Sequence, residues 1–227
     1  EFRRVLFRSL LLSYTNAGIT DATAKNDLQT VGNAQISTTQ SKFGGSSIAF
    51  DGTGDYLVSS TGNPNLMFGT GDFTVECWVY ITRAIGNTDG FFQNKTGDNL
   101  NLQRNSSGNL QAWDGSDRIS TTAVSSNTWH HVAVTRQSGT VKLFINGNVV
   151  ASSTFNGSIT ADAPTIGATP GNVYAMVGYI QDLKVYKGIA KYVSNFYVPQ
   201  VSAVNESTTG LNYNVSGSST NQVCITS

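Results

Sequence analysis

Two adjacent residues, His130 and His131, are the only histidines in the chain and the first candidates for metal binding or catalysis. They lie in residues 129–136, where apolar and polar residues alternate as in a β-strand. Adjacent residues on a strand point to opposite faces of a sheet, so the two imidazoles cannot bind one metal ion together. We therefore expect one histidine to be packed in the interior and the other to lie at the surface.

The carboxylates are also poorly placed for catalysis. Glycosidases use two carboxyl groups, which lie about 5–5.5 Å apart in retaining enzymes. Glu76 stands alone on its predicted strand, with Thr74 and Trp78 as its neighbours on the same face. The sequence contains no Glu-x-Asp-x-Glu pattern and no Gly-x-Ser-x-Gly motif that would present a nucleophilic serine. These observations indicate that the protein is not an enzyme.

The strongest ligand-binding candidate is Trp113, which is followed by Asp114, Asp117 and Arg118. An exposed tryptophan can stack on the apolar face of a sugar ring, while carboxylate and guanidinium groups bond to its hydroxyls. The alternative is that Trp113 belongs to the core and that the Asp-Gly pair after it only turns a hairpin. Trp78 and Trp129, in contrast, lie within predicted strands and are expected in the core.

Short alternating segments predict that the chain is built from β-strands. In residues 73–81 the odd positions are apolar and the even positions are polar or aromatic, which is typical of a strand with one face in the core. Asn146-Gly147, between residues 140–145 and 148–154, favours the positive φ angles of a two-residue hairpin turn. The only helical candidate is a turn or two within residues 188–196. Further strands are expected at 47–50, 56–59, 90–95, 99–104, 109–113, 129–136, 164–167 and 174–187.

The composition suits an all-β protein and argues against some partners. Charged residues make up 12% of the 227 residues, about half the share usual in soluble domains, and the formal net charge is zero. Without residues 1–9, the chain has 11 basic and 13 acidic residues and no basic stripe that could follow a phosphate backbone. Nucleic acid is therefore not an expected partner. No apolar run approaches the ~18 residues of a membrane span.

The sequence is interpreted as three segments. Residues 1–9 begin without Met and match nothing downstream, so they are interpreted as a non-native scar, or alternatively as a leader remnant. Residues 10–200 form one domain, within the usual size of a single β-sandwich. Residues 201–227, rich in Ser, Thr and Asn, are a linker, a tail or the start of a next module. The sequence leaves open whether Cys77 and Cys224 form a disulfide.

Five segments together resemble the laminin-G-like jelly-roll family of the concanavalin A-like lectin/glucanase group. They are residues 42–57, 68–80 (FGTGDFTVECWVY), 127–136, 141–148 and 178–186, in the order and at the spacing of that family. The resemblance covers about residues 10–199 and implies an antiparallel β-sandwich of two sheets with six or seven strands. Residues 68–80 and 187–199 (KGIAKYVSNFYVP) are similar to modules of phage virion proteins and environmental bacterial surface proteins.

The resemblance also implies one structural Ca²⁺. Many relatives hold this ion with an aspartate of the last long strand and with groups near the first loop. The matching positions are Asp182, and Asp21 with backbone carbonyls near Asn26. The first loop departs from the family pattern, however, because Lys25 stands where a small residue is usual. Lys25 could supply a positive charge in place of the ion.

We therefore expect a non-catalytic binding module that recognises a glycan or another cell-surface ligand, a cell-surface protein included. Such a module would be part of an adhesin or a phage virion appendage, and would work extracellularly, at a cell surface or on a virion. The alternative is a structural or decoration domain without a small ligand, assembled into a larger surface or virion protein. A glycosidase or polysaccharide lyase is the least supported class, because the required carboxylates are missing.

Overall fold

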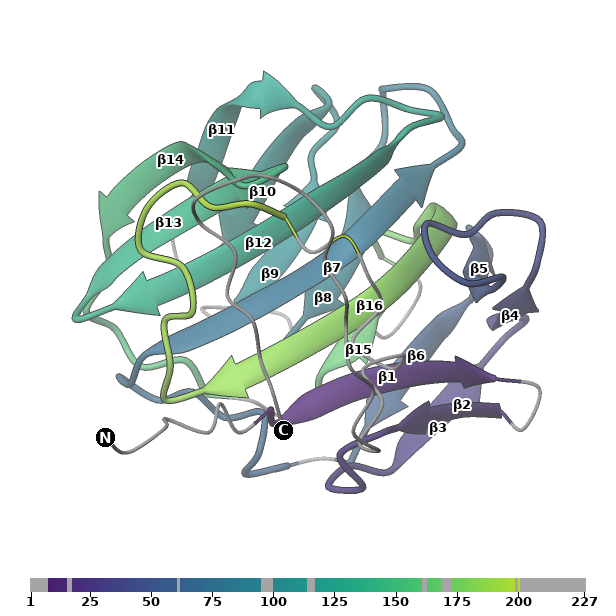
Figure 1. Cartoon of the computed structure of the whole chain (residues 1–227), viewed down its shortest axis with the longest axis horizontal. Coiled ribbons are helices and arrows are strands. Elements are labelled where there is room, and N and C mark those ends of the chain that lie inside the picture. Colours follow the sequence, from purple (N-terminus) through teal and green to yellow (C-terminus); the bar gives the residue numbers. More distant parts are fainter. Residues whose placement is uncertain are drawn as a thin grey trace, which may run out of the picture.

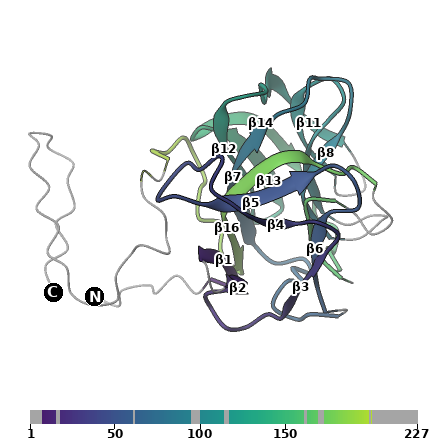
Figure 2. The same cartoon turned by 90° about the vertical axis from the view of Figure 1, so that its right-hand side faces the viewer.

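The alternating segments of the sequence pair into two antiparallel β-sheets, which pack face to face (Figures 1 and 2). The computed structural model describes residues 8–15, 18–60, 62–94, 100–113, 117–160, 163–168, 173–198 and 200, and none of these residues is helical. Within this part of the chain there is accordingly no helix that could cross a membrane. The all-β sandwich predicted from the sequence is confirmed.

The larger sheet has nine strands and forms the front layer in Figure 1. Its main path runs β14-β13-β12-β7-β16-β1-β2, and β5 pairs with β16 and with β4. The strands are β1 (Leu10–Thr15), β2 (Gly18–Asp21), β4 (Gln35–Ser37), β5 (Ser47–Asp51), β7 (Phe73–Ile81), β12 (Trp129–Gln137), β13 (Thr140–Ile145), β14 (Asn148–Thr154) and β16 (Val177–Lys187).

The smaller sheet has seven strands in the order β11-β10-β9-β8-β15-β6-β3. They are β3 (Leu28–Val31), β6 (Tyr56–Ser59), β8 (Asp89–Gln93), β9 (Asn101–Arg104), β10 (Asn109–Trp113), β11 (Asp117–Ala123) and β15 (Thr165–Ile166). The expectation of six or seven strands in each sheet holds for this sheet only, because the larger sheet also contains the short strands β2 and β4.

The core lies between the two sheets, and alternate residues of β7 point into it. The odd residues of this strand, from Phe73 to Ile81, are fully buried in the core. Burying each such apolar side chain contributes about 1.5–3 kcal/mol to folding. Trp78 is buried as expected, but it points to the other face, where Lys42 and Phe43 cover it. Trp129 also lies on that outer face, half-buried beside Tyr80, so its expected place in the core is wrong.

The predicted hairpin is confirmed at β13 and β14. Asn146 and Gly147 have φ angles of 50° and 80°, and a side chain at Gly147 would collide with the carbonyl oxygen of Phe196. Glycine is therefore required at this position both for the turn and for the close approach of a second segment.

That second segment consists of residues 188–198 and is named the strap here. It leaves β16 and crosses the outer face of the larger sheet, where Figure 1 draws it in yellow-green. Its backbone bonds to Thr74 of β7 and Thr135 of β12, and the amide of Phe196 donates to the carbonyl of Gly147. Stacking of Tyr192 on Phe196 fixes its fold. The helical turn expected within residues 188–196 is wrong, because the strap consists only of bends and irregular backbone that these contacts hold in place.

Residues 1–7 and 201–227, with Cys224, lie outside the described residues, so the assignments of both ends stay predictions. Cys77 is a free thiol in the centre of the core, and burial holds its pKa well above the ordinary value. The segment before residue 47 contributes four strands to the sheets, which the sequence only hinted at with its apolar start at residues 10–14.

Candidate functional site

Glu76 lies at the centre of a sealed polar cluster beneath the strap. Its Oε1 bonds to Nζ of Lys191 at 2.6 Å, and its Oε2 accepts a hydrogen bond from the Tyr192 hydroxyl at 2.6 Å. Nε2 of His131 lies 3.2 Å from Oε2. Burial raises the pKa of Glu76, but the hydrogen bond from His131 and the charge of Lys191 outweigh it and hold this pKa well below 4.5. Glu76 is fully buried, so it stabilises the strap rather than meeting a substrate.

The two histidines do point to opposite faces of the larger sheet, as predicted. His131 packs under the strap against Trp78 and Glu76, whereas His130 lies beside Ser125, whose hydroxyl is 2.9 Å from its Nε2. Both are buried, at 1% and 8% exposure, so the expectation of one surface histidine is wrong. The strap covers the face that an alternating strand would otherwise expose. Burial also lowers the pKa of His130, which favours its neutral form.

The two aspartates predicted to bind calcium have other partners. The carboxylate of Asp21 accepts hydrogen bonds from the backbone amides of Leu11, Thr23, Lys25 and Asn26. The hydroxyl of Thr23 and the side-chain amide of Asn26 donate to the same carboxylate.

Asp182 sits in a bulge of β16 with a φ of 58°, and its Oδ2 lies 2.6 Å from Nζ of Lys184. Among the described residues, no group of three or more His, Cys, Asp or Glu side chains could hold a metal ion. N–H and ammonium donors thus surround the oxygens that a cation would need, and the arrangement does not fit a calcium site. Lys25 and Asn26 instead tie the loop down, because they donate to the carbonyls of Arg8 and Ser9. Calcium stays a prediction that binding experiments must decide.

The predicted ligand-binding residues are divided between two faces of the smaller sheet. Trp113 stands opposite Asp117 in the register of β10 and β11, and Arg118 stands opposite Ala112, which is in the core. Arg118 therefore points inward, where its guanidinium lies 5.9 Å from the ring of Phe155. Asp114 lies outside the described residues. Trp113 is half-buried on the outer face, so the four residues do not form one cluster.

A row of polar positions leads from Trp113 across the outer face of the smaller sheet. Thr165, Gln93, Asn101 and Trp113 are direct cross-strand partners on four neighbouring strands, and we name them the Trp113 row. Thr165, Gln93 and Asn101 are at least 93% buried. Their side-chain oxygens have no hydrogen-bond partner within the described part of the chain. Such buried acceptors are rare in folded proteins and call for a donor from water or a ligand.

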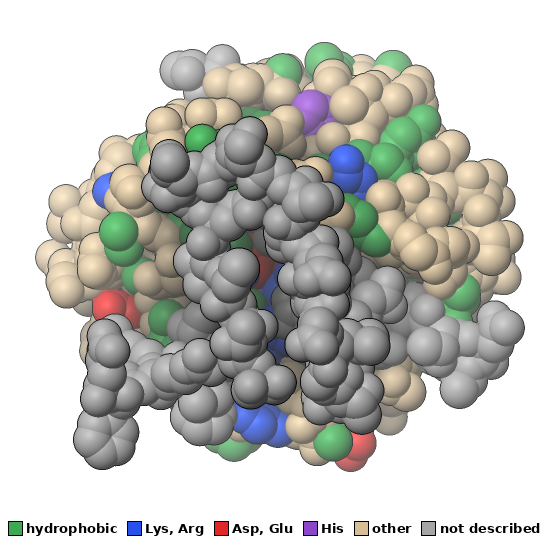
Figure 3. Space-filling view, in the orientation of Figure 1, with side chains coloured by type: hydrophobic (Ala, Val, Ile, Leu, Met, Phe, Trp, Pro, Cys, Tyr) green, Lys and Arg blue, Asp and Glu red, His purple; other side chains and the backbone are tan. Residues whose placement is uncertain are grey.

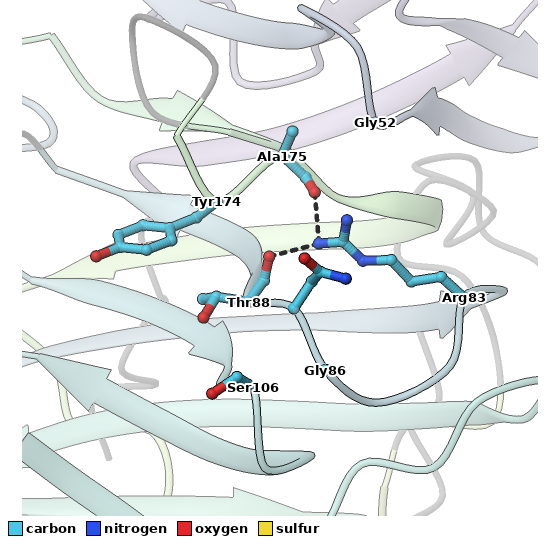
Figure 4. A pocket seen from close by; sticks show the side chains of 8 residues that line it. Gly52, Arg83, Gly86, Thr88, Ser106, Tyr174 and Ala175 are labelled. Atoms are coloured by element: carbon cyan, nitrogen blue, oxygen red, sulfur yellow. Dashed lines mark hydrogen bonds between the residues drawn. The ribbon is translucent and has the colours of Figure 1, made fainter.

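An open pocket lies at one end of the sandwich, where loops of both sheets meet (Figure 4). It has a volume of about 400 Å³. Four connections contribute to it: the β5–β6 turn, the β7–β8 loop, the β9–β10 turn and the segment before β16. We name it the rim pocket. The described residues that line it are Gly52, Arg83, Gly86, Asn87, Thr88, Ser106, Tyr174 and Ala175.

Arg83 is the one charged side chain among these described residues, and it is held rigidly. Its Nη2 donates to the backbone carbonyls of Thr88 and Ala175, as Figure 4 shows, at 2.5 and 2.7 Å. Its Nε lies 2.8 Å from Oδ1 of Asp89. The other oxygen of Asp89 bonds to Arg104, which is fully buried. Arg83 remains 22% exposed, so its guanidinium is fixed at the pocket wall with access to solvent.

Tyr174 supplies an aromatic edge to the rim pocket. It is 43% exposed and has a φ of 59°, an uncommon value for a residue other than glycine. Its ring extends away from Arg83 in Figure 4, so a ligand that touches both must extend along the pocket. Its neighbour Val173 and Ile85 of the β7–β8 loop are also large apolar residues with more than 40% exposure. Val173 and Ile85 do not line the rim pocket, so its aromatic surface comes from Tyr174, beside hydrogen-bonding groups such as ligand sites commonly have.

Residues 51–190 match the family described as the concanavalin A-like lectin/glucanases superfamily. The chain belongs to this superfamily. The match covers more than half of the chain and includes every described residue that lines the rim pocket. The resemblance noted in the sequence is thereby confirmed. No curated protein sequence matches the chain.

Solved structures with the same fold include binding domains of botulinum neurotoxins. The serotype C1 domain has a TM-score of 0.62 at 12% identity, and the serotype G domain has 0.63 at 10%. A third, the binding domain of neurotoxin DC in complex with SialylT, has 0.60 at 16%. Each match covers 81% of this chain and 48–49% of the other, so the superfamily domain spans about half the length of these structures. At such low identity the likeness shows the shared fold alone.

The rim pocket could not be found from sequence patterns. Its residues come from four connections that are far apart in the chain, and Arg83, Ser106 and Tyr174 stand in no recognisable motif. The one available signal was the density of Gly, Asn, Ser and Thr in these connections of the superfamily domain, which predicts turns rather than a ligand.

Proposed function

We propose that this domain is a non-catalytic binding module that takes a glycan in the rim pocket. The observation that carries the proposal is the exposed ring of Tyr174 in an open pocket with a fixed guanidinium and the hydroxyls of Thr88 and Ser106. Aromatic rings pack against the C–H faces of sugars, and hydroxyl and guanidinium groups bond to sugar hydroxyls. Loops at the end of a rigid sandwich are where binding sites commonly lie.

The chemistry of the rim pocket supports binding rather than hydrolysis. No Asp or Glu is among the described residues that line it. Asp89, the acid behind Arg83, is buried and bonded to two guanidiniums, so it cannot act on a ligand. Glycoside hydrolysis needs two carboxyl groups that face the scissile bond.

The surroundings of the domain are also part of the proposal. The neurotoxin DC binding domain has been solved in complex with SialylT and in complex with rat synaptotagmin II. By analogy, we place the present domain outside the cell, in an adhesin or a phage virion appendage that meets a cell-surface glycan or protein. The face seen in Figure 3 carries few charged side chains, which suits an exposed module of this kind.

A glycan array with three proteins tests the site. We expect Tyr174→Ala to reduce binding at least about tenfold, because the stacking surface is lost. The matched control is Tyr197→Ala, since Tyr197 is fully exposed and lies in the strap. That variant should bind like the wild type. Equal binding by all three proteins would rule out the rim pocket as the site.

The Trp113 row is a second location for the same function, supported by its buried acceptors. Trp113→Ala would then remove binding while Tyr174→Ala leaves it intact. The other candidate function, a structural or decoration domain, is supported by the low share of charged residues, 12% of the chain. It predicts stable oligomers in size-exclusion chromatography and no glycan bound by any of the variants.

A further inference from the structure

We propose that the rim pocket selects acidic saccharides and that Arg83 receives their carboxylate. This inference rests on the proposed function, because it names the class of glycan that the same pocket takes. It follows from the way in which three charged residues share one buried corner of the sandwich: Asp89, Arg104 and Arg83.

Asp89 is a single carboxylate between two guanidiniums. Nη2 of Arg104 lies 2.7 Å from one of its oxygens, and Nε of Arg83 lies 2.8 Å from the other. The backbone amide of Val177 also donates to this carboxylate. Asp89 therefore has no oxygen left for a further cation, and the three side chains together carry an excess of one positive charge.

The two arginines differ in what remains open to solvent. Arg104 is fully buried and donates to Ser126 and to the carbonyls of Arg83 and Ala84. Nη2 of Arg83 donates to the carbonyls of Thr88 and Ala175, and its buried Nε faces Asp89 as an ion pair; no bond to its Nη1 is formed within the described part of the chain. Because 22% of the Arg83 side chain is exposed while its Nε is buried and its Nη2 is bonded, we assign Nη1 as the group that meets a ligand in the pocket.

Nearby carboxylates do not occupy this position. Asp51 precedes Gly52, a lining residue, but its carboxylate accepts a hydrogen bond from the Thr53 amide within the same turn. Asp55 bonds to the amides of Asn33 and Asp51. Neither lines the rim pocket. Among the described residues, no carboxylate therefore lines the pocket beside Arg83, and a ligand can supply the complementary negative charge.

The neutral groups of the pocket suit a sugar that carries such a charge. Thr88 and Ser106 offer hydroxyls, and Tyr174 offers an apolar ring at the far side from Arg83. A carboxylate on Arg83 gains a charge-assisted hydrogen bond, which is stronger than the bond to a neutral hydroxyl. A chain of more than one sugar could place its acidic group on Arg83 and the next ring near Tyr174.

The test compares glucuronate with glucose by following backbone amide NMR shifts of Thr88, Ser106 and Tyr174 in the full chain. We expect saturable shifts with glucuronate and a dissociation constant at least about tenfold lower than that for glucose. Raising the NaCl concentration from about 50 mM to about 500 mM should weaken glucuronate binding and leave glucose binding unchanged. Sodium acetate is the control ligand, because it carries a carboxylate without a sugar ring.

Two variants test whether the guanidinium of Arg83 causes the preference for glucuronate. Arg83→Lys keeps the charge but loses the fork that spans Asp89 and the two carbonyls, so the preference for glucuronate should shrink. Ser106→Ala leaves the buried charges in place and should weaken both sugars equally. Equal affinity for glucose and glucuronate at the pocket would overturn the acidic preference and leave the binding module standing. If the domain binds glycans but the NMR shifts change only outside the rim pocket, both the rim site and this inference would be overturned.

Discussion

The hydroxyl of Tyr192 donates a hydrogen bond of 2.6 Å to Oε2 of Glu76, although 116 residues separate them in the chain. Glu76 belongs to the central strand of the larger sheet, and Tyr192 belongs to the strap. The contact therefore joins an irregular segment to the centre of the fold. It is buried, and Lys191 and His131 bond to the same carboxylate.

Tyr192→Phe should destabilise the protein by about 1–3 kcal/mol, because the variant leaves Oε2 of buried Glu76 with one partner fewer. Burial raises the pKa of Tyr192 well above its ordinary value, so its hydroxyl stays protonated and remains a donor at neutral pH. Urea unfolding measures the difference. Tyr197→Phe, which changes a fully exposed tyrosine, is the control and should unfold like the wild type.

Acid should remove the contribution of Glu76. Since the pKa of Glu76 in the folded protein lies below 4.5, its value when exposed, ionisation stabilises the fold above that pH. The contribution falls as the pH drops below about 4.5 and is lost once the pH passes the lowered pKa. Glu76→Gln should be less stable than the wild type at pH 7, and this gap in the free energy of unfolding should narrow in acid. A gap that is constant from about pH 7 to pH 3, measured by urea unfolding, would contradict this.

Calcium should leave the melting temperature unchanged, because hydrogen-bond donors surround the carboxylate of Asp21. If Ca²⁺ added to the metal-free protein raised the melting temperature, the ion that the family resemblance implies would be reinstated. Asn26→Ala, in contrast, should cost about 1–3 kcal/mol, since the Asn26 side chain bonds to Ser9, Asp21 and Asn63. Asn65→Ala is a suitable comparison, because Asn65 donates its one side-chain bond at the surface.

Thr165→Val tests the Trp113 row. The Thr165 hydroxyl is buried and has no partner in the described part of the chain, so its replacement by a methyl group should be neutral or slightly stabilising. A loss of more than about 1 kcal/mol would mean that water or another group bonds to this oxygen in solution. Thermal unfolding of Thr165→Val and the wild type, with and without a bound glycan, distinguishes a bond to water from a bond to the glycan.

The sequence predicts the fold well where the alternation is strong. Residues 73–81 and 129–136 became central strands, and Asn146-Gly147 became a hairpin turn, because local pattern and burial agree there. The strap was predicted wrongly because its conformation depends on Glu76 and Gly147, which are distant in the chain. Its own residues have no period that would reveal these contacts.

The candidate site was less predictable. Trp113 and Asp117 do stand opposite each other in the pairing of β10 and β11. Arg118 could have been excluded earlier, since it follows Asp117 directly and must point to the other face of a strand. The rim pocket depends on how four connections meet in space, and only the pairing of the strands fixes that arrangement.

The strap has a mechanical consequence for any larger protein that contains this chain. A pulling force applied beyond residue 198 reaches the sandwich through the strap, and would have to detach Phe196, Tyr192 and Lys191 in turn before it loads β16. Those attachments would open one after another and not all at once. The strap would thus give the domain an extensible end that protects its sheets from tension.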